Sequence, residues 1–451
     1  MLVEFSVENY RSFKERQTLS MVASKKKTGQ NSNSFPMPNV KSLRLLTSAV
    51  VYGPNASGKS NLVRAIQTMR QIVLESATGM QLGSRWNIEP FRLNADCQNK
   101  PSCFEIIFIE DNIRYQYGFS LDQERVYEEW LIAYPKGRAQ TWFERNYCSE
   151  EQDYDWYFGP GLKGEKERIK GFVRPNSLFL SHAAQNNHIQ LGKIFTWFRY
   201  KLKLIPASLD YLYKFTALKC AKDKNFLEKI FKLIKGADIG ISTLDIEQQT
   251  IDGYVKKVPD EIQEDLKNNI NKIIKTIDKN RINDNSSELE SVITYPQVLA
   301  LYKMNDSDQT IAFDLEDESD GTQRLFEMGG YWIDALDNGE ILIIDELDRS
   351  LNSELSTYLI KEFNDKAANQ NNAQLIVTTH DTTFLDREIF NQDQVWLMQK
   401  DSNNSTKLYS LLDFKIREDE SLQKGYLKGR YGAMPFVSGL DSYDSYKTRK
   451  H

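Results

Sequence analysis

The sequence contains few cysteines and histidines, and neither is arranged as a metal or disulfide site requires. The 451 residues include four histidines and four cysteines: Cys97, Cys103, Cys148 and Cys220. No two cysteines form a C-x-x-C pair. The pattern therefore argues against both a disulfide framework and a structural zinc site.

Long apolar runs are also missing. No run approaches the ~18 residues of a membrane-spanning helix. The N-terminal stretch MLVEFSVENYRSF carries charges and has no apolar core of the kind found in signal peptides. The sequence therefore predicts a cytosolic protein without a membrane partner.

Composition gives no general case for nucleic-acid binding, because the net charge is −5. The hydrophobic content of 40% and charged content of 27% are typical of a globular chain long enough for two or three domains. Charge is nevertheless uneven along the chain. Leu191–Lys235 contains eleven basic and three acidic residues, whereas Glu316–Asp348 is strongly acidic.

The strongest local signal is GPNASGKS at residues 53–60. It follows the apolar stretch Leu45–Tyr52, predicted to be a buried strand, and precedes Asn61–Glu75, whose apolar residues have helical spacing. Strand, G-x-x-x-x-G-K-S and helix together form a phosphate-binding loop. Lys59 would bind the β- and γ-phosphates and Ser60 would bind Mg²⁺. The predicted nucleotide-binding residues are Gly53, Pro54, Asn55, Ala56, Ser57, Gly58, Lys59, Ser60 and Asn61.

A second motif combines a very apolar strand with two acids. Ile341–Ile344 is predicted to be a central parallel strand, followed by Asp345 and Glu346. Ligands bind at the carboxyl edge of such sheets, so Asp345 is predicted to hold Mg²⁺ and Glu346 to polarise the attacking water. His380 follows the next buried strand and is predicted to reach the γ-phosphate.

The N-terminal third is rich in predicted strands. Met1–Tyr10 alternates apolar and polar residues, and Ser102–Phe108 with Ile113–Leu121 reads as a hairpin. These segments predict an antiparallel sheet added to a parallel core. Lys25–Asn39 is predicted to be an exposed loop, and Ser177–Leu180 a short strand.

From residue 191 the character changes. Helical spacing occurs in Asp223–Lys235 and again from Asp260, where Asp260 and Gln263 could form a capping box. We therefore divide the chain into residues 1–190, a mostly helical insertion at 191–290, and residues 291–451. The basic segment is read as a solvated face over a core, with nucleic acid or an acidic partner protein as alternatives, because aromatics are interleaved in it: Phe195, Trp197, Phe198, Tyr200, Tyr211, Tyr213 and Phe215.

The order of motifs resembles the ABC-type ATPase heads of the SMC, RecF and OLD-like group. Residues 53–60 correspond to Walker A, 341–346 to Walker B and His380 to the switch histidine. ESDGTQ at 318–323 occupies the place of the LSGGQ-type signature. Ser319 and Gly321 match that signature, whereas Glu318 and Asp320 replace Leu and Gly.

This resemblance implies a fold class and further site residues. The fold would be an α/β P-loop head with a mixed sheet, an antiparallel β-subdomain and a mostly helical insertion. Ser319 and Gly321 would contact ATP bound to a second copy, giving a head-to-head dimer with two ATP molecules between the copies. Gln185 would be the Q-loop glutamine near Mg²⁺, Arg11 would touch nucleotide, and residues 347–351 would form the D-loop.

Several segments together are similar to the ATPase subunits of bacterial phage-defence operons, of the RloA, AbiL, PARIS and Septu types. They are MLVEFSVENYRSF, YGPNASGKSN, ESDGTQRL, IIDELDRSL, TTHDTTFLD and GRYGAMP. The resemblance implies a sensor or holder that works with a separately encoded effector, often a nuclease.

The leading hypothesis is therefore a Mg²⁺-dependent ATPase whose dimer closes on ATP and regulates an effector in phage defence. Two alternatives stay open. One is a RecF- or SMC-like ATPase that binds DNA during repair or recombination. The other is a scaffold that assembles on ATP and hydrolyses it slowly.

Overall fold

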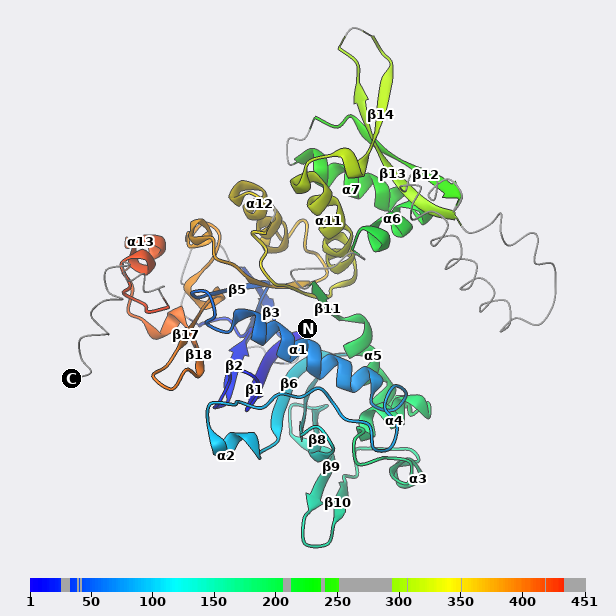
Figure 1. Cartoon of the computed structure of the whole chain (residues 1–451), viewed down its shortest axis with the longest axis vertical. Helices are drawn as coiled ribbons and strands as arrows, with labels where there is room; N and C mark the ends of the chain where they lie inside the picture. The colour runs from blue at the N-terminus through cyan, green and yellow to red at the C-terminus, as the bar shows by residue number, and fades with distance from the viewer. Residues whose placement is uncertain are drawn as a thin grey trace, which may run out of the picture. The chain divides into compact units, whose positions relative to one another are not determined.

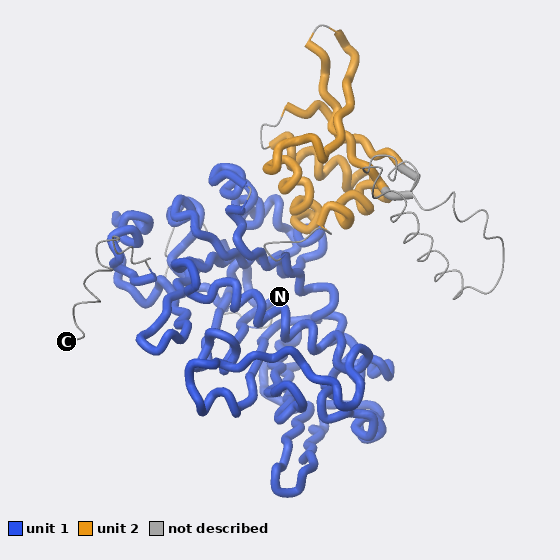
Figure 2. The backbone as a smooth tube through the Cα atoms, viewed as in Figure 1, with its two compact units in different colours: residues 1–208, 334–451 blue, residues 209–333 orange. Residues whose placement is uncertain are grey.

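The protein is described by a computed structural model that covers residues 1–25, 33–38, 40, 43–205, 212–236, 240–250, 294–305, 307–349, 351–417 and 419–433. The chain divides into two compact units (Figure 2): residues 1–208 with 334–451 form unit 1, and residues 209–333 form unit 2. The helix predicted from Asp260 lies outside the described residues.

Unit 1 contains a six-stranded sheet with five parallel strands and one antiparallel edge strand. In spatial order the strands are β11 (Leu202–Ile205), β15 (Ile341–Ile344), β16 (Gln374–Thr378), β5 (Ser48–Tyr52), β17 (Val395–Lys400) and β18 (Thr406–Ser410). Every residue of β15, β16 and β5 is buried, as their apolar sequences predict. The carboxyl ends of these three neighbouring strands share one edge.

The second sheet of unit 1 is antiparallel and has seven strands. Their order is β10 (Asp153–Phe158), β9 (Gln140–Cys148), β8 (Val126–Tyr134), β7 (Ile113–Leu121), β6 (Ser102–Glu110), β1 (Leu2–Glu8) and β2 (Gln17–Ser20). The predicted hairpin at 102–121 is confirmed. So is the predicted fold class, an α/β head in which an antiparallel sheet accompanies a parallel core.

Helix α1 (Lys59–Glu75) joins the two sheets through its apolar face. Leu62, Ile66 and Met69 belong to one core cluster with side chains from both sheets. Figure 1 shows α1 running from the end of β5 towards α4 (Phe179–Gln185) and α5 (Ile189–Tyr200). The phosphate loop is therefore anchored between a buried strand and a buried helix.

The strand predicted at Ser177–Leu180 is wrong, because this segment begins helix α4. The buried carboxylate of Glu129, on β8, accepts hydrogen bonds from the backbone N–H groups of Phe179 (2.7 Å) and Leu180 (3.0 Å). A carboxylate at the first N–H groups of a helix stabilises its N-terminus. Burial raises the pKa of Glu129, and the nearby Arg145 opposes that shift.

Two further predictions in unit 1 need correction. Within the predicted loop at 25–39, β3 (Ser34–Pro36) pairs with β4 (Arg44–Leu46), and Phe35 and Met37 are buried. The single strand predicted at 45–52 is thus two strands, β4 and β5, in different sheets. The polar residues around Phe35 and Met37 made this segment look more exposed than it is.

The predicted domain boundary at 191 differs from the structure, because α5 and β11 belong to unit 1. The Trp197 ring stacks on Phe108 of β6 with 4.0 Å between ring centroids. Phe195, Trp197 and Phe198 are all buried in the same core cluster. These interleaved aromatics of the basic segment are therefore core residues, as the solvated-face interpretation requires.

Unit 2 combines helices with a three-stranded antiparallel sheet, and residues 251–290 of the predicted helical insertion lie outside the described residues. It contains α6 (Leu212–Lys222), α7 (Lys224–Gly236), the sheet β12 (Thr243–Thr250), β13 (Thr294–Lys303) and β14 (Thr310–Asp314), η1 (Leu315–Asp317) and most of α11 (Asp320–Asn338). Helix α6 packs on α11 through the Tyr213 and Phe326 rings, whose centroids are 5.6 Å apart.

The remaining elements of unit 1 are short. They are α2 (Ala95–Gln98), α3 (Lys166–Lys170), α12 (Ser353–Asn364), η2 (Thr382–Phe384), η3 (Gln392–Gln394), η4 (Leu411–Asp413) and α13 (Leu422–Leu427). Across the part of the chain that the structure describes, no helix combines the length and apolarity needed to cross a bilayer.

Candidate nucleotide-binding site

The loop between β5 and α1 has a shape that only glycine permits at two positions. Gly58 has φ 116°, and a Cβ there would lie 2.4 Å from Thr406 Oγ1. A Cβ on Gly53 would lie 2.4 Å from the Met398 carbonyl oxygen. None of the described side chains caps α1 at Gly58. The loop and the first N–H groups of α1 thus form an anion-binding end of the helix.

Lys59 is the cation at the centre of this loop. Its Nζ donates hydrogen bonds to the carbonyl oxygens of Gly53 (2.5 Å) and Pro54 (3.3 Å) and lies 3.4 Å from His380 Nδ1. Burial lowers the pKa of Lys59 to about 8, while Asp345 and Glu346 oppose this shift. The predicted residues Lys59, Asp345, Glu346 and His380 therefore meet at one edge of the sheet.

Thr378 organises the two acids, and the sequence analysis missed it. Its Oγ1 donates to Asp345 Oδ1 (2.6 Å) and accepts from the backbone N–H of Glu346 (2.9 Å). The pairing of Ile344 with Val377 places Asp345 beside Thr378. A hydroxyl residue at the end of the next parallel strand was the signal that could have revealed it.

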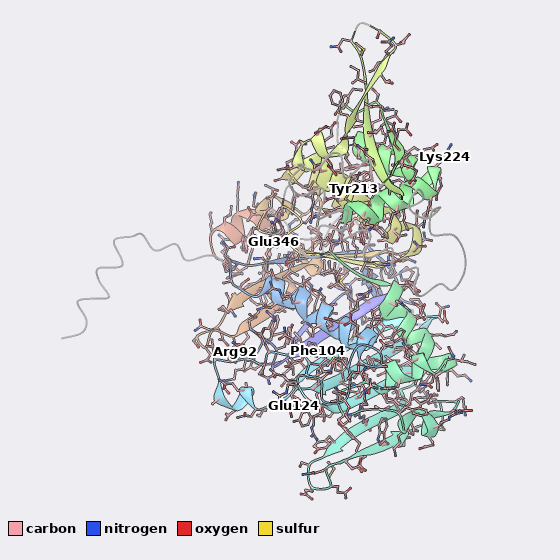
Figure 3. All side chains as sticks on the ribbon, turned by 45° about the vertical axis from the view of Figure 1, so that its right-hand side comes forward. Arg92, Phe104, Glu124, Tyr213, Lys224 and Glu346 are labelled. Carbon is pink, nitrogen blue, oxygen red and sulfur yellow. The ribbon has the colours of Figure 1, made fainter. Side chains whose placement is uncertain are left out.

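Glu346 has an unusual backbone. Its φ is 55°, a left-handed conformation that a residue with a Cβ adopts rarely. The turn is held by hydrogen bonds from Leu347 N to Thr378 O and from Arg349 N to Glu346 O, both 3.0 Å. Strain maintained by surrounding bonds is typical of functional positions. The left-handed backbone at Glu346 therefore ends the strand in a tight turn next to Asp345 (Figure 3 labels Glu346).

The segment predicted as a D-loop follows directly. Asp348 Oδ2 accepts a hydrogen bond from the backbone N–H of His380 (3.3 Å). Asp348 Oδ1 is buried and has no hydrogen-bond partner among the described residues. Residue 350 of this segment lies outside them. Asp348 therefore adds a third carboxylate beside His380.

Ser60 and Asn61 form the start of α1. Asn61 Nδ2 donates to Ser12 Oγ (2.8 Å), which is also hydrogen-bonded to Thr406 Oγ1 (2.9 Å). The turn predicted at Asn9–Phe13 therefore lies beside the phosphate loop. Arg11, next to Ser12, has its guanidinium at 3.3 Å from Glu89 Oε1 and at 3.2 Å from Tyr10 Oη. Arg11 is thus close to the loop but paired with Glu89.

The position of Gln185 contradicts its predicted role as a metal ligand. Gln185 is exposed and ends α4. That helix contacts the far end of α1, where Ser181 Oγ lies 2.8 Å from Ser76 Oγ (Figure 1). The 17 residues of α1 separate this end from Lys59 by roughly 25 Å. Strand β11 ends at Ile205, at the sheet edge that holds Lys59. The residues that follow it, 206–211, lie outside the described residues.

The predicted signature residues lie in unit 2 and have their own bonding network. Ser319 Oγ accepts a hydrogen bond from the Thr322 N–H (3.2 Å), so Ser319 caps α11. Gly321 is in the first turn of this helix. Tyr302 Oη donates to the Glu318 carboxylate (2.9 and 3.0 Å to its two oxygens), and Gln323 Nε2 donates to the Glu318 carbonyl oxygen (2.8 Å). Glu318, which replaces the usual leucine, therefore braces the loop.

A cavity of about 880 Å³ opens on the phosphate loop. Its wall extends well beyond the predicted site, because the end of β17 and helix α13 take part in it. The lining residues are Gly53, Pro54, Asn55, Ser57, His380, Thr382, Gln399, Lys400, Tyr426 and Leu427.

Comparison with solved structures finds SMC head domains. An SMC head domain from Thermotoga maritima is 11% identical, with a TM-score of 0.39, covering 92% of this chain and 99% of that one. An SMC head bound to the C-terminal winged-helix domain of ScpA is 13% identical (TM-score 0.40; 91% and 97% covered). An SMC head from Pyrococcus furiosus, with an extended coiled coil and bound to the C-terminal domain of ScpA, is 14% identical (TM-score 0.34; 95% and 98% covered).

None of the curated proteins compared with the chain matches it. A family model does: the family described as "AAA domain, putative AbiEii toxin, Type IV TA system" matches residues 48–386. The matched region begins at β5, contains the phosphate loop and the Asp345–Glu346 turn, and ends just after His380. The chain belongs to this AAA-domain family of putative AbiEii toxins.

Proposed function

We propose that the protein is an ATPase that hydrolyses ATP to ADP and phosphate with Mg²⁺. The observation that carries the proposal is the meeting of Lys59, Asp345, Glu346 and His380 at the carboxyl edge of three adjacent strands. Phosphoryl transfer requires mainly positioned charge, and this edge supplies a cation, a helix N-terminus and carboxylates.

The residues fit a nucleotide with a divalent cation. Lys59 would neutralise the β- and γ-phosphates, and the N–H groups of the loop and of α1 would hold their oxygens. Mg²⁺ usually takes one or two protein oxygens together with substrate phosphates. Ser60 and the buried Asp345 carboxylate, fixed by Thr378, would hold it. When bound, Mg²⁺ would neutralise charge that builds up on the phosphates.

Glu346 is the candidate general base. Its carboxylate would accept the proton of the attacking water, and its constrained backbone would keep the carboxylate aimed at the reaction centre. His380, 3.4 Å from Lys59 Nζ, would hydrogen-bond the γ-phosphate or the water. Thr378 would act as a positioning residue, since it bonds to both Asp345 and the Glu346 backbone.

We further propose that two copies close on two ATP molecules. Ser319 and Gly321, at the N-terminus of α11, would contact the γ-phosphate bound to the second copy. The 19-residue helix and the Ser319 cap support this role, because the first N–H groups of such a helix attract anions.

The biological role that we propose is regulation of a separately encoded partner effector, such as a nuclease, in defence against phage. The motifs quoted above support it, and the family description refers to a putative AbiEii toxin in a toxin–antitoxin system. The closing and opening of the ATP-bound dimer would control the effector. With ATP as substrate, the proposal also places the protein in the cytosol.

The direct test compares ATP turnover and ATP affinity of the wild-type protein with those of Glu346→Gln. We expect turnover to fall by about 10²- to 10⁴-fold, the usual contribution of a general base, with affinity unchanged. Equal turnover in both proteins would refute the role of Glu346. Dimerisation on ATP without measurable wild-type turnover would favour the scaffold alternative.

One observation favours nucleic-acid binding as a second candidate function. Helices α6 and α7 contain seven lysines and one acid, and Lys214, Lys224 and Lys232 are exposed (Figure 3 labels Lys224). Such a surface could contact the phosphates of a nucleic-acid backbone independently of base sequence. Duplex DNA should then bind in a salt-dependent way that weakens when these three lysines become glutamine. No binding at low salt would exclude it.

A further inference from the structure

The phosphate-loop cavity includes a cation that belongs to no recognised motif. Lys400 is the last residue of β17, which is parallel to β5. The end of β17 therefore lies at the same edge as Gly53 and His380, on the opposite side of the loop from β16. Lys400 lines the same cavity as Gly53, Asn55 and His380.

Lys400 is close to the loop backbone. It pairs in register with Thr406 on β18, and Thr406 Oγ1 donates to the Ser57 carbonyl oxygen (2.7 Å). The two strands thus attach Lys400 to the tip of the phosphate loop. A four-carbon side chain at this position can extend into the cavity.

Among the described residues, the ammonium group of Lys400 makes no hydrogen bond or ion pair at ordinary distances, and only Asp401 acts on it electrostatically. The adjacent Asp401 accepts backbone hydrogen bonds from Asn403 and Ser405 (both 2.9 Å) and lies 3.8 Å from Lys407 Nζ. Burial lowers the pKa of Lys400, and the charge of Asp401 only partly offsets this. A half-buried cation without a partner favours an incoming anion.

The C-terminal motif GYLKGRYGA forms the wall behind Lys400. Tyr426 Oη donates to the Ala433 carbonyl oxygen (2.7 Å), and Ala433 N donates to Gln399 Oε1 (2.9 Å). A Cβ on Gly432 would lie 2.7 Å from the same Gln399 oxygen. Residues 425–433 therefore fix Gln399, and with it the end of β17. This role accounts for a motif that the proposed ATPase chemistry does not use.

We propose that Lys400 is a second phosphate-binding cation, which contacts the terminal phosphate of the bound nucleoside triphosphate from the side opposite to Asp345. The inference rests on the proposed function, since it needs a nucleotide on the phosphate loop. The terminal phosphate is the part concerned because the cavity joins Lys400 to His380, whose ring lies beside Lys59 Nζ.

The test measures ATP and ADP affinity by calorimetry for the wild-type protein, Lys400→Ala, Lys400→Arg and Lys366→Ala. We expect Lys400→Ala to weaken ATP binding about tenfold, as the loss of one charge-assisted hydrogen bond predicts, and ADP binding less than threefold. Lys400→Arg should retain most of the ATP affinity. Lys366 is an exposed cation between α12 and the amino end of β16 that does not line the cavity, so Lys366→Ala controls for net charge.

Unchanged ATP affinity in Lys400→Ala would overturn the inference. Equal losses for ATP and ADP would also overturn it, because the terminal phosphate would then not be the group recognised. An equal loss in Lys366→Ala would overturn it as well, because net charge would then explain the effect. Thermal melting of each variant without nucleotide shows whether the fold is intact. A wild-type protein that binds no ATP would instead refute the proposed function, so the two failures are distinguishable.

Discussion

The phosphate-loop edge of unit 1 and the signature loop of unit 2 are built in different ways. At the phosphate-loop edge, residues far apart in sequence bond across strands: Thr378 to Asp345, and His380 to Asp348. In the signature loop, the described bonds of Ser319 and Glu318 reach residues at most 16 positions away. The geometry of the phosphate-loop edge is therefore determined by the pairing of strands in the sheet. The signature loop is held by local bonds, as a segment that contacts another copy requires.

The largest expected effect comes from removing the cation of the phosphate-loop edge. Lys59→Ala should weaken ATP binding by about 100-fold or more, because truncating one partner of a close charge pair typically removes 2–5 kcal/mol. Calorimetry measures the loss. Ser319→Ala, in unit 2, is the matched comparison and should leave ATP affinity of the monomer unchanged. Equal losses in both variants would contradict the division between the two regions.

Thr378 tests whether cross-strand bonding matters for the reaction. Thr378→Val keeps the shape but removes the hydroxyl that holds Asp345 and the Glu346 backbone. Losing about 1–1.5 kcal/mol of hydrogen bonding should lower turnover about tenfold. Thr378→Ser retains the hydroxyl and should keep near wild-type turnover. A Thr378→Ser protein as slow as Thr378→Val would show that packing, not the hydroxyl, is responsible.

The protonation state of Lys59, in unit 1, predicts that ATP affinity depends on pH. Burial lowers the pKa of Lys59 to about 8, so the free site loses its positive charge as the pH rises through that value. Phosphates bind the charged form, so ATP affinity should fall about fivefold between pH 8 and pH 9. Lys59→Arg stays charged in this range. The same slope in Lys59→Arg would exclude Lys59 as the titrating group.

The smallest expected effect concerns the brace of the signature loop. Tyr302→Phe removes the hydrogen bond to Glu318 and should reduce turnover about threefold, with ATP affinity unchanged, because one part-buried hydrogen bond contributes about 0.5–1 kcal/mol. Phe313→Leu, on the same hairpin, keeps that bond and should behave as wild type. Identical turnover in Tyr302→Phe and wild type would show that the brace has no functional part.

The motifs that carry Lys59, Asp345 and His380 could be recognised in the sequence because each motif is local. A glycine turn, a four-residue aliphatic strand and the residue that follows a strand can each be recognised without tertiary contacts. Prediction from the sequence failed where distant residues decide. The carboxylate of Glu129 stabilises the N-terminus of α4, which follows some 50 residues later. The sequence gives no sign of this contact, so Gln185 was interpreted as a loop residue. The β17 end was missed for the same reason, since only the sheet order places Lys400 beside the phosphate loop.

The central claim is that one copy binds ATP at Lys59 and a second copy completes the site through Ser319. The most direct measurement is ATP turnover in mixtures of two inactive variants, Lys59→Ala and Ser319→Glu, whose added carboxylate would repel phosphate at the α11 N-terminus. Each variant alone should be inactive. In a mixed dimer, one site combines an intact phosphate loop with an intact signature loop, so turnover should reappear on mixing. Mixtures that stay inactive while both variants fold and dimerise would contradict the account.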